Sequence, residues 1–222
     1  QFFPPEKTAL VGIPLRNEIK NIPPDPFTLL NIPQDKPLIY VTGGSSGAER
    51  LNSIILRSLS LLLPHYRIFH QTGPTNLDEM KLSAQSLLDG NPDLDSYYLE
   101  GTIPANMVSA LMSAASLIIT RAGSTTLFEV AFHGKPAIII PIPEDVSRDQ
   151  RTNAYAYARS GGATVIEEHN LTQSLLTQEI STIINDQNRY QEMSRAAKDT
   201  FLDGAAKKVA DILISIGTEH GS

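Results

Sequence analysis

From residue 37 onward, short apolar runs alternate with longer amphipathic stretches, and this alternation restricts the chain to few folds. The runs are Leu38–Thr42, Tyr66–Gln71, Tyr97–Glu100, Leu117–Thr120, Ala137–Pro141 and Ala163–Glu167. Helices are expected between and after them, at about 47–62, 77–90, 105–115, 125–133, 150–160, 172–186, 188–201 and 204–216. Runs with little internal alternation are typical of strands buried on both faces of a parallel sheet. The sequence therefore predicts an α/β, Rossmann-like fold with a doubly wound parallel six-stranded sheet.

Residues 1–36 have a different character, because they contain seven prolines and no sustained period. Proline removes a backbone donor and keeps the preceding residue extended. The sequence thus predicts a connector over 1–36, laid on a surface, and a single Rossmann-like domain over 37–222. The chain begins with Gln1 and no basic-then-apolar leader, and we expect it to be part of a longer protein.

Composition excludes several classes of function. Eighteen Lys and Arg against 24 Asp and Glu give a net charge of -6, whereas a nucleic-acid partner would call for a basic surplus or stripe. The absence of Cys excludes disulfides, thiol nucleophiles and zinc ribbons. No apolar stretch approaches the roughly 20 residues that span a membrane. The histidines lack metal-ligand spacing, and Asp93-Leu94-Asp95 precedes the third strand, so we expect neither a metal nor another cofactor.

Glycine-rich turns follow the first and fourth predicted strands. They read TGGSSGA over residues 42–48 and TRAGSTT over residues 120–126, each directly before a predicted helix. Glycine lets backbone amides approach a ligand, and the free amides of a helix N-terminus attract phosphate. In the common strand order 3-2-1-4-5-6 these strands are neighbours, and ligands bind at their carboxyl ends. Either turn alone could be a simple strand-to-helix turn, but together they favour a diphosphate site.

Two other phosphate motifs fit poorly. A nicotinamide enzyme would favour G-x-G-x-x-G with an acid about 20 positions further on, at the end of the second strand. Thr42 stands at the first glycine position, and Thr72-Gly73 occupies the place of the acid. No Lys follows Gly47, so the turn is not a Walker A loop either.

Four further residues, at three places in the chain, each allow two interpretations. Glu129, in the second turn of a helix, could accept hydrogen bonds from a ribose diol, but Thr126-x-x-Glu129 also matches a capping box. Asp149 and Gln150 follow the fifth strand and could bind sugar hydroxyls or belong to a polar loop that caps the next helix. Arg16 could neutralise a phosphate from the connector or merely begin a short helix.

Together these motifs resemble the GT-B glycosyltransferases of peptidoglycan synthesis. The resembling segments are G-x-P-x-R at 12–16, GGS-x-GA at 43–48, R-x-G-x-x-T-x-x-E at 121–129, G-x-PA at 134–137, Q-x-x-NA at 150–154 and GGA at 161–163. The chain is most similar to the members that add N-acetylglucosamine from its UDP-sugar to lipid I, which makes lipid II. The resemblance covers nearly the whole chain, and corresponds to the carboxyl-terminal, donor-binding half of such an enzyme with its interdomain connector.

The resemblance implies a set of donor-binding residues. They are Arg16, Gly44, Ser45, Ala105, Ser124, Thr125, Thr126, Glu129, Asp149 and Gln150. The turn at Ser45 and the arginine of the connector would hold phosphate, and residues 124–129 would hold the diphosphate and, through Glu129, the ribose. The backbone near Ala105 would read the uracil edge. Gln150 would contact the sugar hydroxyls.

The activity implied is that of an inverting, metal-independent transferase. Its catalytic base, its acceptor site and its membrane surface would lie in an amino-terminal domain, so no catalytic residue is expected in this chain, which alone would bind the donor without turnover. The full-length protein would be cytoplasmic and peripheral on the inner face of the bacterial plasma membrane. Alternatives are half of a non-hydrolysing UDP-sugar epimerase, a non-catalytic nucleotide-sugar-binding module and, less well supported, an oxidoreductase.

Overall fold

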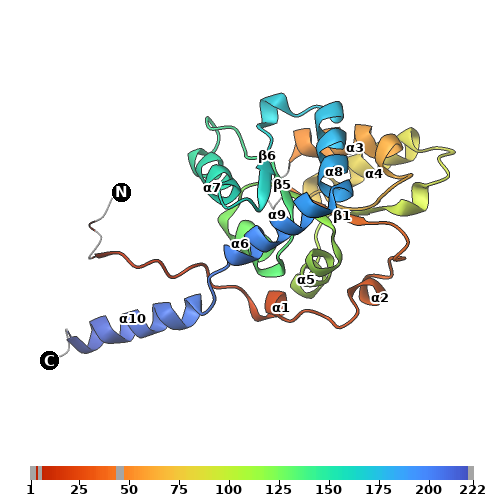
Figure 1. Ribbon diagram of the computed structural model, residues 1–222. Helices are drawn as coiled ribbons and strands as arrows, with labels where there is room; N and C mark the ends of the chain where they lie inside the picture. The colour runs from red at the N-terminus through yellow and green to blue at the C-terminus, as the bar shows by residue number, and fades with distance from the viewer. Residues whose placement is uncertain (1–3, 5–6, 44–47, 220–222) are drawn as a thin grey trace.

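A six-stranded parallel sheet forms the centre of the protein (Figure 1). The computed structural model describes residues 4, 7–43 and 48–219. The strands are β1 (Leu38–Thr42), β2 (Arg67–Gln71), β3 (Tyr97–Glu100), β4 (Leu117–Thr120), β5 (Ala137–Ile139) and β6 (Ala163–Val165). Their order is β3-β2-β1-β4-β5-β6, and all neighbouring pairs are parallel. The predicted fold class and strand order are confirmed.

Every helix expected from the sequence is present, with ends that differ by a few residues. The longer helices are α3 (Glu49–Leu62), α4 (Leu77–Leu87), α5 (Ala105–Ala114), α6 (Ser124–His133), α7 (Arg148–Ala158), α8 (Gln173–Asn185), α9 (Gln187–Asp199) and α10 (Ala205–Glu219). Two short helices lie in the proline-rich segment: α1 (Asn17–Lys20), which begins directly after Arg16 as one of the two interpretations of that residue allowed, and α2 (Pro26–Leu30), which was not predicted. Short 3-10 turns are η2 (Pro74–Asn76), η3 (Leu94–Ser96) and η4 (Glu168–Asn170).

The strands divide their side chains between two cores, one on each face of the sheet. In β1, Ile39 and Val41 face the layer that contains α3 and α8. Leu38 and Tyr40 face the opposite layer, which contains α5 and α6. All of these side chains are buried, as a parallel sheet covered on both faces requires. Neighbouring positions of one strand therefore serve different layers, and Tyr40 belongs to the α5–α6 layer.

The connector is packed into the protein more deeply than its proline content indicated. Ile19, Leu30 and Ile32 are buried, and the hydroxyl of Ser109 on α5 donates to the carbonyl of Ile19 at 2.9 Å. Figure 1 shows the segment running beneath α5. Gly12 has a φ of +83°, and a Cβ there would lie 2.9 Å from the Phe128 ring of α6. The connector is thus held against the same two helices that form one core.

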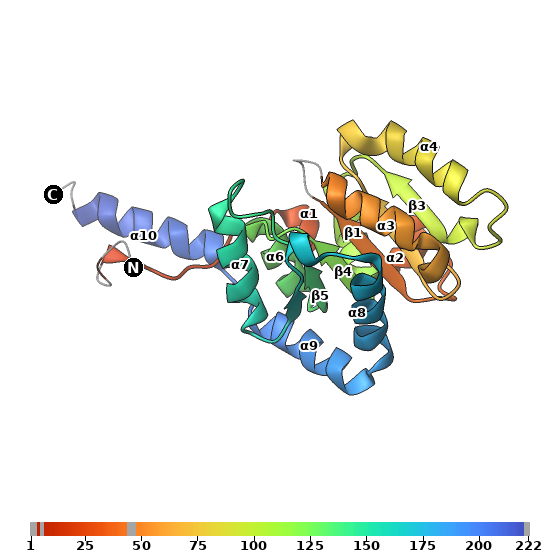
Figure 2. The ribbon, with the colours of Figure 1, turned by 90° about the horizontal axis from the view of Figure 1, so that it is seen from above.

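The last helix, α10, extends away from the sheet on the side where the N-terminal segment also lies (Figures 1 and 2). Leu213 and Ile214 are 64% and 65% exposed. Among the described residues, no helix is both long and apolar enough to cross a membrane.

A buried polar network joins the second and third strands to the first turn of α3. His70 Nδ1 lies 2.9 Å from the Tyr97 hydroxyl, and its Nε2 lies 3.0 Å from Asn52 Oδ1. The Asn52 amide donates to the Thr72 carbonyl at 3.1 Å. Burial lowers the pKa of His70 to about 3. The imidazole is therefore neutral in the folded protein at physiological pH.

This network predicts a loss of stability in mild acid. The unfolded chain binds a proton at His70 near pH 6.5, while the folded chain does not, so unfolding becomes easier as pH falls below that value. Between pH 7.5 and 5, the wild type should lose about 2 kcal/mol more unfolding free energy than His70→Gln, measured by urea unfolding. Equal losses in the two proteins would contradict a neutral His70.

Candidate functional site

A pocket of about 330 Å³ opens at the carboxyl ends of β1, β2 and β3. It is lined by Arg16, Tyr40, Thr42, Gln71, Gly73, Pro74, Gly101, Thr102, Val108, Met112, Thr126 and Glu129. Three of the predicted site residues meet here, namely Arg16 from the connector and Thr126 and Glu129 from α6. This is the edge at which a doubly wound sheet binds its ligands.

Glu129 is the buried charge of this pocket. Its residue exposure is 6%, and its Oε1 lies 3.7 Å from Nη2 of Arg16, whose side chain is 62% exposed. Burial raises the pKa of the Glu129 carboxyl, and the Arg16 guanidinium opposes that rise. A carboxylate held in a pocket with one partly solvated partner keeps oxygen lone pairs available to accept hydrogen bonds from a diol.

The capping-box interpretation of Glu129 is wrong. The N-cap of α6 is Gly123, so Thr126 lies inside the helix and cannot cap it. No side chain caps α6 among the described residues. Ser124 and Thr125 are exposed, and the part of the chain that the structure describes provides no side-chain acceptor that caps the first-turn amides of α6. Such an end suits an anion, because the free amides and the helix dipole both favour negative charge.

The turn that leads into α6 is held by two amide side chains of α7. Gln150 Oε1 accepts hydrogen bonds from the backbone amides of Ala122 and Ile142, at 3.2 and 3.4 Å. Asn153 Nδ2 donates to the Ala122 carbonyl at 3.3 Å. Here Gln150 supports the turn; its contact with sugar hydroxyls stays a prediction. Asp149 is exposed beside it, and neither of these two residues lines the pocket.

Arg121 also holds the turn that leads into α6. Its Nη1 donates to the Ile140 carbonyl at 3.2 Å, and its guanidinium forms an ion pair with Glu168. The side chain is almost fully buried, and through these contacts this arginine supports the turn that leads into α6.

Three other predicted residues, Gly44, Ser45 and Ala105, are not found among the described residues that line the pocket. Gly44 and Ser45 fall outside the described residues. Gly43, which precedes them, must be glycine, because a Cβ there would lie 2.4 Å from the Ala48 Cβ. Ala105 begins α5 and does not line the pocket, although Val108, one turn further along the helix, does.

Tyr40 and Gln71 are among the polar residues of the pocket that were not identified from the sequence. Tyr40 sits within the apolar run of β1, and Gln71 ends β2. The Tyr40 hydroxyl donates to Gln71 Oε1 at 2.6 Å. A polar residue at the carboxyl end of a buried strand was the available signal for Gln71. Nothing in the pattern distinguishes Tyr40 from a core aromatic residue.

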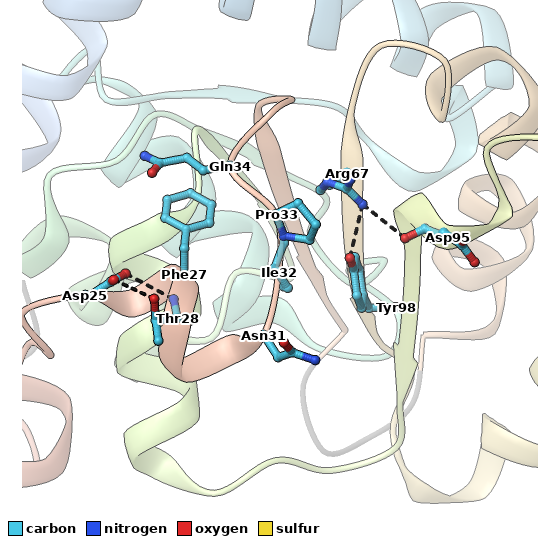
Figure 3. A pocket seen from close by; sticks show the side chains of 10 residues that line it. All are labelled: Asp25, Phe27, Thr28, Asn31, Ile32, Pro33, Gln34, Arg67, Asp95 and Tyr98. Carbon is cyan, nitrogen blue, oxygen red and sulfur yellow. Dashed lines mark hydrogen bonds between the residues drawn. The ribbon is translucent and has the colours of Figure 1, made fainter.

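A larger pocket, of about 790 Å³, lies at the opposite edge of the sheet (Figure 3). Its one arginine, Arg67, donates to both carboxylate oxygens of Asp35, at 2.6 and 3.0 Å, and also to the Asp95 carbonyl and the Tyr98 hydroxyl. The guanidinium is thus already paired within the protein.

In the Asp93-Leu94-Asp95 segment, the Asp93 carboxylate pairs with the Lys36 ammonium group at 2.8 Å. No group of three or more potential metal-ligating side chains occurs within the described ranges.

Comparison with known proteins gives a consistent assignment. The model of the glycosyltransferase family 28 C-terminal domain matches residues 38–211. A protein of Shouchella clausii, named UDP-N-acetylglucosamine--N-acetylmuramyl-(pentapeptide) pyrophosphoryl-undecaprenol N-acetylglucosamine transferase, is 34% identical over 201 residues, which are 89% of this chain and 53% of that protein. The chain therefore spans about half the length of this relative.

Solved structures agree with this match. The crystal structure of MurG from Acinetobacter baumannii has a TM-score of 0.67 at 28% identity, over 82% of this chain and 53% of that one. A putative UDP-N-acetylglucosamine 2-epimerase from Listeria monocytogenes has a TM-score of 0.64 at 15% identity, over 90% of this chain and 51% of that one. At that identity the second likeness concerns the fold alone.

The buried carboxylate predicts that Glu129→Gln stabilises the folded protein. Because the pKa of Glu129 is raised above its ordinary 4.5, its ionised form is disfavoured in the folded state, and that cost is present at high pH and absent below pH 4.5. Urea unfolding should find the variant more stable than the wild type at pH 8 and equal to it at pH 4. The exposed residue Glu192 gives the control, since Glu192→Gln should change neither value. A variant less stable at pH 8 would mean that Glu129 supports the fold.

Proposed function

The chain belongs to the glycosyltransferase family 28 C-terminal domain family, and we propose that it is the donor-binding half of an inverting UDP-N-acetylglucosamine-dependent transferase. The acceptor we propose is lipid I, so that the product is lipid II of peptidoglycan synthesis. Support comes from the names of the Shouchella clausii relative and of the Acinetobacter baumannii structure. In this assignment, this chain binds the nucleotide-sugar and the other half of the enzyme binds the acceptor.

The observation that carries the proposal is the meeting of a buried carboxylate, a cation and an uncapped helix N-terminus at one edge of the sheet. Glu129 would accept hydrogen bonds from the ribose diol. The first-turn amides of α6, with the hydroxyls of Ser124 and Thr125, would bind the diphosphate. Arg16 would turn from Glu129 to a phosphate oxygen, because the ribose hydroxyls then satisfy the carboxylate.

The same groups suit the chemistry of the leaving group. When the glycosidic bond breaks, negative charge gathers on UDP, and amides already aimed at the phosphates stabilise that charge without rearrangement. The acceptor hydroxyl must also lose a proton to a general base. We propose that this base belongs to the amino-terminal half of the whole enzyme, so this chain alone binds the donor without turnover.

We further propose that the whole enzyme works at the inner face of the plasma membrane. Its acceptor is lipid-linked, as the name of the Shouchella clausii relative states for that protein. The acceptor-binding half would supply the membrane surface, and the donor half would present UDP-N-acetylglucosamine from the aqueous side.

An epimerase half shares this architecture, as the Listeria monocytogenes structure indicates. The transferase is preferred because the chain is 34% and 28% identical to the transferase relatives, against 15% to the epimerase. A non-catalytic nucleotide-sugar module would bind the same donor, and is distinguished by turnover when the chain is joined to an amino-terminal half.

The proposed function predicts that UDP binding does not depend on a divalent metal ion. Because amides and Arg16 supply the positive potential, UDP should bind this chain with the same affinity in EDTA as in Mg²⁺. Calorimetric titration of UDP in both buffers measures the two affinities. Loss of binding in EDTA would overturn the metal-free mechanism.

The proposed function also predicts that Glu129 recognises the ribose hydroxyls. Glu129→Gln should weaken UDP binding about tenfold, or about 1.4 kcal/mol, because a neutral amide replaces a charged acceptor. The wild type should bind 2′-deoxy-UDP more weakly than UDP, and the variant should barely distinguish the two. Glu192→Gln, on the exposed face of α9, is the matched control and should bind as the wild type does. Undiminished UDP binding by Glu129→Gln would remove this residue from the site.

A further inference from the structure

We propose that His70 and Asn52 are positioning residues of the donor site, which together hold the turn after β2 against the start of α3 in the geometry that binds the nucleotide. Neither side chain lines the pocket of the candidate site. The inference rests on the proposed function, since it concerns how the pocket proposed for UDP keeps its shape.

The turn after β2 forms part of the wall of the candidate site. Gly73 and Pro74 line its pocket, while Thr75 and Asn76 line a second pocket of about 330 Å³ beside the start of α3. Gly73 has a φ of +85°, a conformation that other residues rarely adopt. The position of this one turn therefore affects the walls of both pockets.

The carbonyl of Thr72 is the point at which this turn is held. It accepts hydrogen bonds from Asn52 Nδ2 at 3.1 Å and from Asn76 Nδ2 at 3.2 Å. Asn52 lies in the first turn of α3, where its backbone amide donates to the Ala48 carbonyl at 2.7 Å. Thr72 and Asn52 are 0% and 1% exposed, so their hydrogen bond is made away from solvent. The side chain of Asn52 thus joins the wall of the pocket to the N-terminal end of α3.

The hydrogen bonds of Asn52 and His70 can be made with only one arrangement of protons. Because Asn52 Nδ2 faces a carbonyl, the atom that lies 3.0 Å from His70 Nε2 is the acceptor Oδ1. Nε2 must then carry the proton, and Nδ1 of the neutral ring carries none. Nδ1 accepts from the Tyr97 hydroxyl at 2.9 Å, and that hydroxyl keeps its proton because burial raises the pKa of Tyr97.

This arrangement fixes the direction in which the Asn52 amide points. If the amide turned over, its oxygen would face the Thr72 carbonyl, and two acceptors would meet. If the proton of the imidazole moved to Nδ1, two acceptors would meet between His70 and Asn52. Buried polar groups left without partners cost stability, so His70 keeps the amide donor of Asn52 on Thr72.

His70 is suited to this task because the sheet holds it on both sides. It pairs with Val41 of β1 and with Leu99 of β3, and it is 0% exposed. Groups that bind a ligand must be held within about 0.5 Å of their productive geometry, and side chains outside the site provide that support. The imidazole therefore serves as the fixed point from which Asn52 sets the turn.

The proton arrangement can be measured in the wild type without any substitution. In ¹⁵N NMR spectra of the histidine-labelled 222-residue chain at neutral pH, His70 should show a proton on Nε2 and none on Nδ1. A proton on Nδ1 would overturn the inference, because Asn52 would then not be held in the direction that Thr72 requires.

Calorimetric titration with UDP tests the effect on the site. Asn52→Asp still accepts from His70 but presents an acceptor to the Thr72 carbonyl, so the turn should move and UDP affinity should fall about tenfold. Asn52→Leu makes neither hydrogen bond and should weaken UDP binding to a similar degree. It tests the same point if Asn52→Asp does not fold.

Tyr97→Phe is the matched control, because it removes a hydrogen bond from the same imidazole at the start of β3, away from the pocket. It should lower the urea midpoint of unfolding, as the Asn52 variants do, and yet bind UDP as the wild type does. If the Asn52 variants keep the wild-type affinity, or if Tyr97→Phe weakens UDP binding as much as they do, the network serves stability alone. The inference is then overturned while the proposed function stands. If the wild type does not bind UDP, the proposed function fails, and this inference fails with it.

Discussion

The adjacency of β1 and β4 at the centre of a parallel sheet is the constraint on which the site depends. Thr42 and Thr120, the last residues of these strands, lie in register. Gly43 and Arg121, which directly follow these strands, therefore lie at the same edge of the sheet. The two crossover helices, α3 and α6, pack on opposite faces, which leaves the edge between them for a ligand.

The connector completes this site because it is fixed to the domain. Its buried side chains, Ile19 among them, pack with α5, and Gly12 allows close approach to α6. Arg16 therefore faces Glu129 across 113 positions of sequence, the difference between their numbers, at 3.7 Å. The carboxylate lies in a pocket that disfavours its charge, because burial raises its pKa. Such a cost is expected where a residue is retained for binding.

The sheet could be predicted closely from the sequence, because strands buried on both faces leave continuous apolar runs and the βα alternation favours one common order. The site was predicted in outline only. Glu129 and Arg16 were identified as candidates. Their pairing depends on how the connector packs, and the proline-rich sequence of the connector has no periodic pattern from which that packing could be predicted. Gln150 was read as a ligand residue, and its hydrogen bonds to Ala122 and Ile142 arise from long-range contacts between α7 and two strand ends. Tyr40 was not identified, because its polar contact in the pocket is a hydrogen bond to Gln71, 31 residues away.

The central claim is that the nucleotide binds at the β1–β4 edge, in contact with the N-terminus of α6. A titration of the ¹⁵N-labelled chain with UDP, followed by amide chemical shifts, tests it most directly. The account predicts the largest shifts at the amides of Ser124, Thr125 and Thr126, with the side-chain amide of Gln71 moving as well. Shifts confined to the opposite edge, around Phe27 and Gln34, would contradict it, as would a spectrum that UDP leaves unchanged.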